Sequence, residues 1–204
     1  MAMIKRFSLF LLLAAIITTS TAQKISLDQF KSWKPRNIGP AGMSGRITAI
    51  DAVVADPNTI YLGAASGGVW KTENSGTTWS PIFDDQASYS TGCITIDPND
   101  PARIWVGSGE NVGGRHVGYG DGVYLSPDSG ATWKNMGLAA TKTIHRIIID
   151  PRNPNTIYVG AMGDPFTADS NRGLYKTTDG GQHWKQILYS NNASGVADLV
   201  MHES

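Results

Sequence analysis

One order of apolar and polar positions occurs three times along the chain. Each copy begins with a short alternating or wholly apolar segment, passes through a proline-containing turn and continues with an Ile-Tyr/Trp-Leu/Val-Gly segment. A segment with a central aromatic residue follows, and a glycine-containing turn then ends in tryptophan at Trp79, Trp133 and Trp184. Short alternating or β-branched runs separated by turn residues predict strands, so each copy is predicted to hold four of them.

A repeat of about 50 residues that is built from strands is typical of β-propeller blades. We therefore predict an all-β fold, a β-propeller of four-stranded antiparallel blades, with about three blades present and the ring incomplete. The blades are expected at 45–86, 87–139 and 140–190, and 195–204 matches the first strand of a fourth. Since a closed propeller needs at least about four blades, we expect an N-terminal fragment of a longer protein. The alternative, an open three-bladed array, would leave edge strands unpaired.

The N-terminus has the pattern of an export signal. Lys5 and Arg6 precede an apolar run from Phe7 to Ile17, and Ser20 and Ala22 supply small residues at the positions that a signal peptidase reads. The run is too short for a membrane anchor, which needs about 20 apolar residues. We predict a signal peptide at 1–22, a lead-in at 23–44, and a periplasmic, outer-surface or secreted protein with no membrane span after the signal.

Composition narrows the partner classes. The chain has 17 basic and 17 acidic residues and no basic block, so no nucleic-acid partner is expected. Its single cysteine, Cys93, lies in an apolar segment and is expected to be a buried free thiol. No phosphate-binding loop, metal-ligand spacing or nucleophile elbow is present, so the sequence predicts no cofactor and no metal.

The three glycine-containing turns share a Ser/Thr-x-Asp/Asn-x-Gly-x-Thr/His-Trp pattern. Its Asp or Asn side chain can accept hydrogen bonds from its own turn, and its glycine tolerates a positive φ. The tryptophan buries a large area against a neighbouring layer. The residues assigned this structural role are Asn74, Gly76, Trp79, Asp128, Gly130, Trp133, Asp179, Gly181 and Trp184.

These turns resemble Asp-boxes, also called BNR repeats. With the repeat, they make the chain similar to the sortilin-like Asp-box β-propeller superfamily, which also includes sialidases, xyloglucanases and the photosystem II stability factor. The stretches Trp33–Arg46 and Gly67–Thr72 look most like large exported bacterial proteins of glycosyl-hydrolase-like type. The resemblance implies that the Asp-boxes lie on outer turns, away from a ligand site. One such fold hosts many functions.

A ligand site is expected where the loops between second and third strands meet the loops that lead into first strands. Copies two and three carry insertions there, Ser108–Asp121 and Met162–Arg172, and long loops on a rigid scaffold often hold binding groups. Paired carboxylates would suit glycoside hydrolysis, and arginines would suit carboxylates or sulfates. The alternative is that these polar residues are solvated or form turns. The candidates are Arg46, Glu110, Asn111, Arg115, His116, Asp121, His145, Arg146, Asp164 and Arg172.

Three functions fit these observations. The first is an exported binding module of sortilin-like type for a protein, peptide or carbohydrate ligand, without catalysis. The second is a xyloglucanase- or sialidase-like glycoside hydrolase acting on extracellular glycans. Resemblance to sialidases implies an arginine triad and a tyrosine with an acidic partner, while the early first-blade aspartate of xyloglucanases has no clear counterpart in Gly45–Asp51. The third is an assembly scaffold like the photosystem stability factor.

Overall fold

The structure is a computed structural model that describes Ser26, Asp28, Ser32, residues 46–111, Gly113 and residues 117–202. The predicted signal peptide at 1–22, nearly all of the lead-in at 23–44, and the candidates Arg115 and His116 lie outside the described residues. The chain separates into two units, Met1–Ile38 and Gly39–Ser204, and the second holds all the strands below. Within the described part, no helix is long and apolar enough to cross a membrane.

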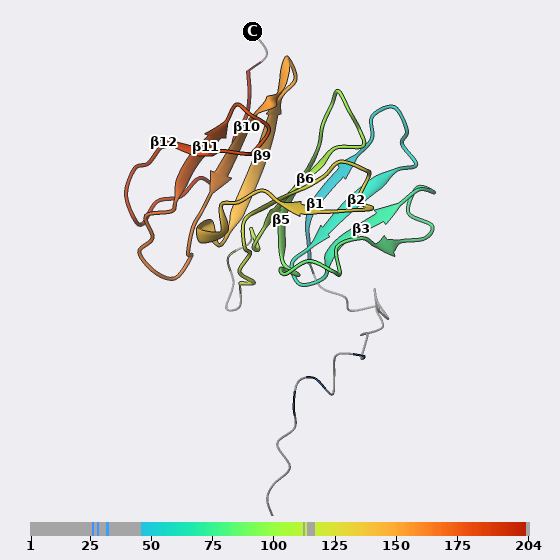
Figure 1. The fold of residues 1–204 in the computed structure, drawn as a ribbon, viewed down its shortest axis with the longest axis horizontal. Helices are drawn as coiled ribbons and strands as arrows, with labels where there is room; N and C mark the ends of the chain where they lie inside the picture. Colours follow the sequence, from blue (N-terminus) through green and yellow to red (C-terminus); the bar gives the residue numbers. More distant parts are fainter. Residues whose placement is uncertain are drawn as a thin grey trace, which may run out of the picture. The chain divides into compact units, whose positions relative to one another are not determined.

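Gly39–Ser204 contains three consecutive four-stranded antiparallel sheets, each ordered as in the sequence (Figure 1). Blade 1 comprises β1 (Ile47–Ala52), β2 (Ile60–Ala64), β3 (Gly68–Thr72) and β4 (Ser80–Pro81). Blade 2 comprises β5 (Thr91–Ile96), β6 (Ile104–Ser108), β7 (Val123–Ser126) and β8 (Lys134–Asn135). Blade 3 comprises β9 (Ile144–Asp150), β10 (Asn153–Ala161), β11 (Gly173–Thr177) and β12 (Lys185–Leu188), preceded by the 3-10 turn η2 (Ala139–Thr141). The predicted all-β fold with four-stranded blades is confirmed.

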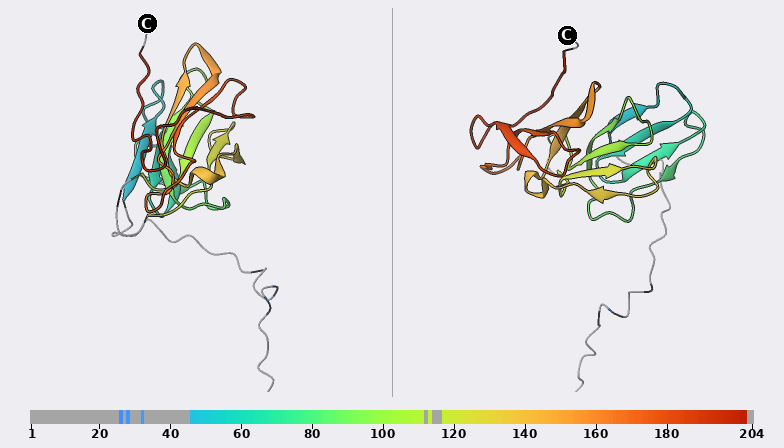
Figure 2. Two further views of the ribbon diagram at one scale, coloured as in Figure 1. Left: turned by 90° about the vertical axis from the view of Figure 1, so that its left-hand side faces the viewer. Right: turned by 45° about the horizontal axis from the view of Figure 1, so that its top comes forward.

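Blade 2 lies between the other two sheets, which the further views of Figure 2 also show. All five residues of β6 are buried, because successive side chains of a strand point to opposite faces and both faces are covered. Trp105 packs into the apolar layer shared with blade 3, while Ile104 and Val106 pack into the layer shared with blade 1. Cys93 is also buried, and burial raises the pKa of its thiol to about 12.

Close approach between blades depends on a glycine in each second strand. A Cβ at Gly63 would lie 2.6 Å from Cγ2 of Thr91, and one at Gly107 would lie 2.5 Å from Cγ2 of Ile144. Thr91 and Ile144 are the first residues of the inner strands β5 and β9. Each inner strand therefore begins against a glycine of the preceding blade, where any larger residue would push the blades apart.

The segment expected to begin a fourth blade, 195–204, differs in part from that expectation. A Cβ at Gly160 would lie 2.8 Å from Cγ1 of Val196, so Val196 takes the place that Thr91 and Ile144 take in the earlier blades. The Val196 amide donates to the Ala161 carbonyl at 3.1 Å. The described residues 195–202 nevertheless form no strand, because no described strand pairs with them.

The Asp-box turns are held by their own side chains. In blade 2, Asp128 accepts hydrogen bonds from the amide and hydroxyl of Thr132 at 2.8 and 2.6 Å, and Gly130 has a φ of 91°. These bonds lower the pKa of Asp128. In blade 3, His183 stands in place of the threonine, and its Nδ1 lies 2.7 Å from Oδ2 of Asp179. The histidine thus occupies the position of the hydroxyl that it replaces.

The Asp-box tryptophans join adjacent blades. Trp133 Nε1 donates to the carbonyl of Ile82, which follows β4, at 2.6 Å, and its ring meets that of Phe83 edge to face with centroids 5.0 Å apart. Trp184 Nε1 donates in the same way to the carbonyl of Met136, which follows β8, at 2.8 Å. Each blade is therefore tied to the connection that leaves the blade before it.

Replacing Trp133 should destabilise the contact between blades 1 and 2 in two separable steps. Trp133→Phe removes the indole N–H but keeps a ring against Phe83, so we expect a loss of about 1 kcal/mol in the free energy of unfolding. Trp133→Ala also removes the partly buried ring, which should raise the loss to about 3 kcal/mol. Denaturant unfolding of both variants measures these values, and equal losses would contradict a separate role for the hydrogen bond.

Candidate functional site

The expected ligand-side loops lie together at one end of the blades. Neighbouring strands of each blade are antiparallel. In every blade, the start of the first strand, the end of the second and the end of the fourth therefore lie at the same edge of the sheet. We call this end the loop face. Its described residues are Arg46 and those of the connections 65–67, 82–90, 109–122 without 112 and 114–116, 136–143, 162–172 and 189–195. The Asp-box turns lie at the opposite end.

The first polar cluster lies where the loops of blades 1 and 2 meet. Glu110, two residues after the end of β6, is buried and forms an ion pair with Arg46, whose side chain is 56% exposed. The Glu110 amide donates to the Gly118 carbonyl at 2.9 Å. Since Glu110 already balances a positive charge, it is not a free general acid or base.

Asn111 joins the inner strands of blades 1 and 2. Its Nδ2 donates to the carbonyls of Thr48 at 3.1 Å and Gly92 at 2.6 Å, and these residues lie in β1 and β5. Its Oδ1 is buried without a hydrogen-bond partner among the described residues. The amide nitrogen therefore has a positioning role, and the oxygen is the part of Asn111 that is free to accept a hydrogen bond.

Asp121 holds the base of the β6–β7 loop. Its Oδ2 accepts a hydrogen bond from the Tyr124 hydroxyl at 2.6 Å, and its amide donates to Ser108 Oγ at 2.9 Å. Burial, followed by the Asp121 hydrogen bond, raises the pKa of Tyr124. Asp121 thus connects the two ends of the insertion between β6 and β7.

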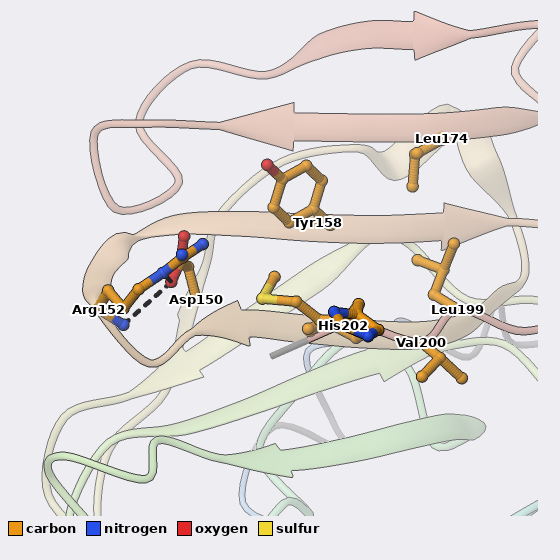
Figure 3. Close-up of a pocket in the computed structure, with 9 residues that line it drawn as sticks. Asp150, Arg152, Tyr158, Leu174, Leu199, Val200 and His202 are labelled. Carbon is orange, nitrogen blue, oxygen red and sulfur yellow. Dashed lines mark hydrogen bonds and ion pairs between the residues drawn. The ribbon is translucent and has the colours of Figure 1, made fainter. Parts of the chain in front are cut away.

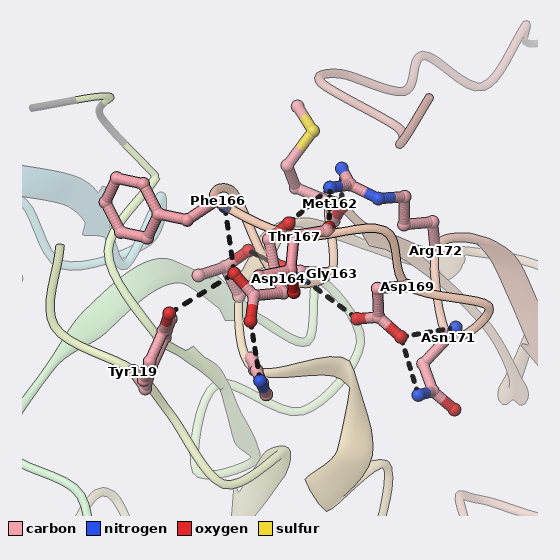
Figure 4. A network of polar contacts seen from close by, with 11 residues as sticks. Tyr119, Met162, Gly163, Asp164, Phe166, Thr167, Asp169, Asn171 and Arg172 are labelled. Carbon is pink, nitrogen blue, oxygen red and sulfur yellow. Dashed lines mark hydrogen bonds and ion pairs between the residues drawn. The ribbon is translucent and has the colours of Figure 1, made fainter. Parts of the chain in front are cut away.

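The second polar cluster joins blades 2 and 3 around Asp164 (Figure 4). The buried Asp164 carboxylate accepts hydrogen bonds from Lys142 Nζ at 2.7 Å, the Tyr119 hydroxyl at 3.2 Å and the Phe166 amide at 2.8 Å. The Lys142 ammonium is the main reason that the pKa of Asp164 lies well below its usual range. The pKa of Tyr119 is raised by partial burial and by the nearby carboxylate, so its phenol stays protonated.

Arg172 stiffens the β10–β11 loop from within. Its guanidinium is buried and donates to the carbonyls of Met162 at 2.6 Å, Thr167 at 3.1 Å and Asp164 (Figure 4). Asp169 accepts a hydrogen bond from the Asp164 amide at 2.9 Å. Arg172 is therefore occupied by the loop itself and does not face a ligand.

His145 and Arg146 lie in the inner strand β9, away from both clusters. His145 is half-buried, and burial lowers its pKa. Arg146 Nε lies 3.5 Å from Oδ1 of Asp198, and both side chains are more than half exposed. The structure thus brings Arg46, Glu110 and Asn111 together and places Asp164 with Arg172, but it does not gather all the candidates in one site.

A cavity of about 330 Å³ lies elsewhere, between blade 3 and the segment Leu199–His202 (Figure 3). Its walls include Tyr158 and Leu174, and its charged groups are paired in the ion pair of Asp150 with Arg152 at 3.2 Å. Apart from this pair and His202, the lining is largely apolar. None of the candidates lines this cavity.

Phe166 and Lys142 on the loop face were not considered in the sequence analysis, whereas Tyr119 is one of the residues of the predicted insertion Ser108–Asp121. Tyr119 and Phe166 are 46% and 57% exposed, and Lys142 binds the carboxylate between them. Lys142 lies two residues before the first strand of blade 3, and the candidate Arg46 lies just before the first strand of blade 1. Considering every cation that precedes a first strand would therefore have identified Lys142. Among the described residues, no group of His, Cys, Asp and Glu could hold a metal ion.

The Asp164 carboxylate should stabilise the chain in a pH-dependent way. Because its folded-state pKa is depressed, its contribution is present above about pH 4 and is lost as the pH falls from there towards the folded-state value. Asp164→Asn should cost about 2 kcal/mol at pH 7, and the difference from the wild type should narrow below pH 4. Urea unfolding at pH 7 and pH 3 measures both values; a difference that stays constant would contradict the assignment.

Comparison with known proteins gives sequence relatives among xyloglucanases. Xyloglucanase Xgh74A of Acetivibrio thermocellus is 26% identical over 190 residues, which covers 82% of this chain and 22% of the relative. An oligoxyloglucan-reducing end-specific xyloglucanase of Emericella nidulans is 24% identical over 200 residues, covering 70% and 24%. The chain thus spans less than a quarter of the length of these relatives. No protein-family model matches the chain.

Solved structures with the same fold include GH74 enzymes and YCF48. An ancestral GH74 enzyme superposes with a TM-score of 0.55 at 22% identity, over 72% of this chain and 19% of that one. The GH74 xyloglucanase of Xanthomonas campestris superposes with a TM-score of 0.51 at 20% identity, over 70% of this chain and 21% of that one. YCF48 from Cyanidioschyzon merolae superposes with a TM-score of 0.50 at 20% identity, over 74% of this chain and 40% of that one. None of these proteins is a sortilin, so the resemblance narrows to an Asp-box β-propeller similar to glycoside hydrolases of the xyloglucanase type.

Proposed function

We propose that this chain supplies a glycan-binding loop face in an exported β-propeller of glycoside-hydrolase type. The observation that carries the proposal is the pair of exposed aromatic residues, Tyr119 and Phe166, that both donate hydrogen bonds to Asp164, Tyr119 from its hydroxyl and Phe166 from its backbone amide. Exposed aromatic rings present flat apolar faces at a polar surface, and such faces suit the apolar faces of sugar rings. The sequence similarity to xyloglucanases supports the same ligand class.

The polar groups around these rings also suit a sugar. Lys142 keeps donors that Asp164 does not use, because an ammonium has three N–H groups and one points to the carboxylate. Its side chain is 41% exposed. Hydroxyl groups of a glycan could therefore bind beside the ring of Tyr119. A few polar groups that fix orientation beside apolar surface are typical of small-molecule sites.

Binding is better supported than catalysis for the two insertion loops. Glycoside hydrolysis uses two carboxyl groups roughly 5 to 10 Å apart on opposite sides of the scissile bond. All four acidic residues of these loops already interact with other protein groups: Glu110, Asp121, Asp164 and Asp169. A catalytic pair would therefore need at least one carboxylate from outside the two loops.

The sialidase alternative fits less well. Arg46 and Arg146 are in ion pairs, and Arg172 is buried among backbone carbonyls. Tyr119 does have an acidic partner in Asp164, but its raised pKa opposes the loss of a proton that a nucleophilic phenol needs. The similarity to YCF48 concerns the fold, so it adds no support for a scaffold role.

Removing either exposed ring should weaken glycan binding. We expect Tyr119→Ala and Phe166→Ala to lower the affinity of the full-length gene product about tenfold, which corresponds to about 1.4 kcal/mol. Affinity electrophoresis and calorimetry would test xyloglucan, arabinoxylan, pectin and a sialylated glycoprotein, with release of reducing ends followed in the same samples. Tyr189→Ala is the matched control, because Tyr189 is 45% exposed but follows the outermost strand β12.

Two results would overturn this proposal. The first is no binding to any of these glycans by the folded wild-type protein. The second is an equal effect of Tyr119→Ala, Phe166→Ala and the control. Release of reducing ends that Tyr119→Ala abolishes would extend the proposal from binding to hydrolysis.

Export is the second part of the proposal. It is supported by Lys5 and Arg6 before the apolar run Phe7–Ile17 and by Ser20 and Ala22 after it. We expect the mature protein to begin at Gln23, which N-terminal sequencing or intact mass measurement of the protein from its own host would check. Ala22→Arg should block this cleavage. An uncleaved wild-type protein retained in the cytoplasm would contradict export.

A further inference from the structure

Two loop-face cations share an arrangement that the proposed glycan site does not by itself require. Arg46 pairs with Glu110, and Lys142 pairs with Asp164. In each pair the carboxylate is buried, whereas the cation is about half exposed. In both pairs the cation is therefore exposed to the solvent, and the buried carboxylate holds it in place.

One short segment connects the two pairs. The Gly118 amide lies 3.4 Å from Oε2 of Glu110, and the Gly120 amide donates to the Lys142 carbonyl at 2.6 Å. A Cβ at Gly120 would lie 2.3 Å from the amide nitrogen of Gly109, so this contact requires glycine. The residue before Tyr119 thus contacts Glu110 of the Arg46 pair, and the residue after it binds the backbone of Lys142.

Lys142 itself is held in an uncommon conformation. Its backbone has a φ of 56° and a ψ of −44°, a conformation that non-glycine residues rarely adopt. In this conformation its ammonium lies 5.0 Å from the centroid of the Tyr119 ring and 2.7 Å from Oδ2 of Asp164. Strained residues of this kind concentrate at ligand sites, where the surrounding structure holds them.

The remaining acidic groups of the insertion loops do not cancel this positive surface. Asp121 accepts a hydrogen bond from the Tyr124 hydroxyl, and Asp169 accepts hydrogen bonds from the backbone amides of Asp164 and Asn171. Asp84 and Asp85 are exposed, but they follow the outermost strand of blade 1 rather than the inner strands. Among the described residues, Lys142 and Arg46 are the exposed cations connected to the Tyr119 segment, and we take them as the charged groups that a ligand on its ring would meet.

From this arrangement we propose that the glycan bound at Tyr119 carries carboxylate groups, as a polymer of uronic acids does. A sugar ring lies on Tyr119, and its carboxylates accept charge-assisted hydrogen bonds from Lys142 and Arg46. Such bonds are roughly twice as strong as those between neutral groups. The inference rests on the proposed glycan-binding function and specifies the substrate class of that site.

Polygalacturonate and its fully methyl-esterified form test the charge alone, because they share one backbone. We expect the full-length gene product to bind the acid at least tenfold more tightly than the ester, and this preference to shrink when salt rises from about 50 to 500 mM. Binding of the ester as tightly as the acid would overturn the inference but leave the proposed function intact. Absence of binding to any glycan would overturn both. Tighter binding of a sulfated galactan than of polygalacturonate would contradict a carboxylate-bearing ligand and would indicate a sulfated one.

Variants assign the preference to Lys142. Lys142→Gln alone leaves the Asp164 charge buried without its partner, so the double variant Lys142→Gln/Asp164→Asn is the cleaner test. It should lower the ratio of the acid affinity to the ester affinity to near one, whatever its effect on the affinity for the ester itself. Lys185→Gln, in the exposed outer strand β12, is the matched control and should leave the preference unchanged. An equal loss for acid and ester in the double variant would contradict the assignment.

Discussion

The rest of the structure depends on the close contact between the second strand of one blade and the inner strand of the next. Gly63 and Gly107 leave room for Thr91 and Ile144, the first residues of β5 and β9. This contact brings whole sheets face to face, so that β6 is buried on both sides. The apolar layers that result are the main source of stabilisation, because each removes large side chains such as Trp105 from water.

The same contact places the loops. Once the inner strands lie side by side, loops of neighbouring blades meet at one end, and their polar groups must find partners across blades. Asn111 of blade 2 reaches the carbonyl of Thr48 in blade 1, and Tyr119 of blade 2 reaches Asp164 in blade 3. The loop face is therefore a continuous polar surface on a rigid support, although each loop belongs to a separate repeat.

Burial decides what each charged group on that surface can do. Glu110 and Asp164 are buried and form ion pairs with Arg46 and Lys142, whereas the two cations are about half exposed to the solvent. A buried carboxylate with a cation partner keeps a low pKa and is a poor proton donor, as the lowered pKa of Asp164 illustrates. In the proposed glycan site the exposed groups are consequently aromatic rings and cations rather than carboxylates.

The sequence by itself determined the strands, the turns and the blade repeat, because these depend on local chemistry. Alternation along a strand and the bonds from Asp128 to Thr132 act within a few residues, so they can be read directly from the chain. The tertiary structure decided the roles of the loop residues. Glu110, Asp164 and Arg172 have the composition of a ligand site in the sequence, yet the fold buries all three, and Lys142 gains its role from a carboxylate 22 residues away. Such partners are brought together only when blades pack, since no local pattern encodes which side of an ion pair will face the solvent.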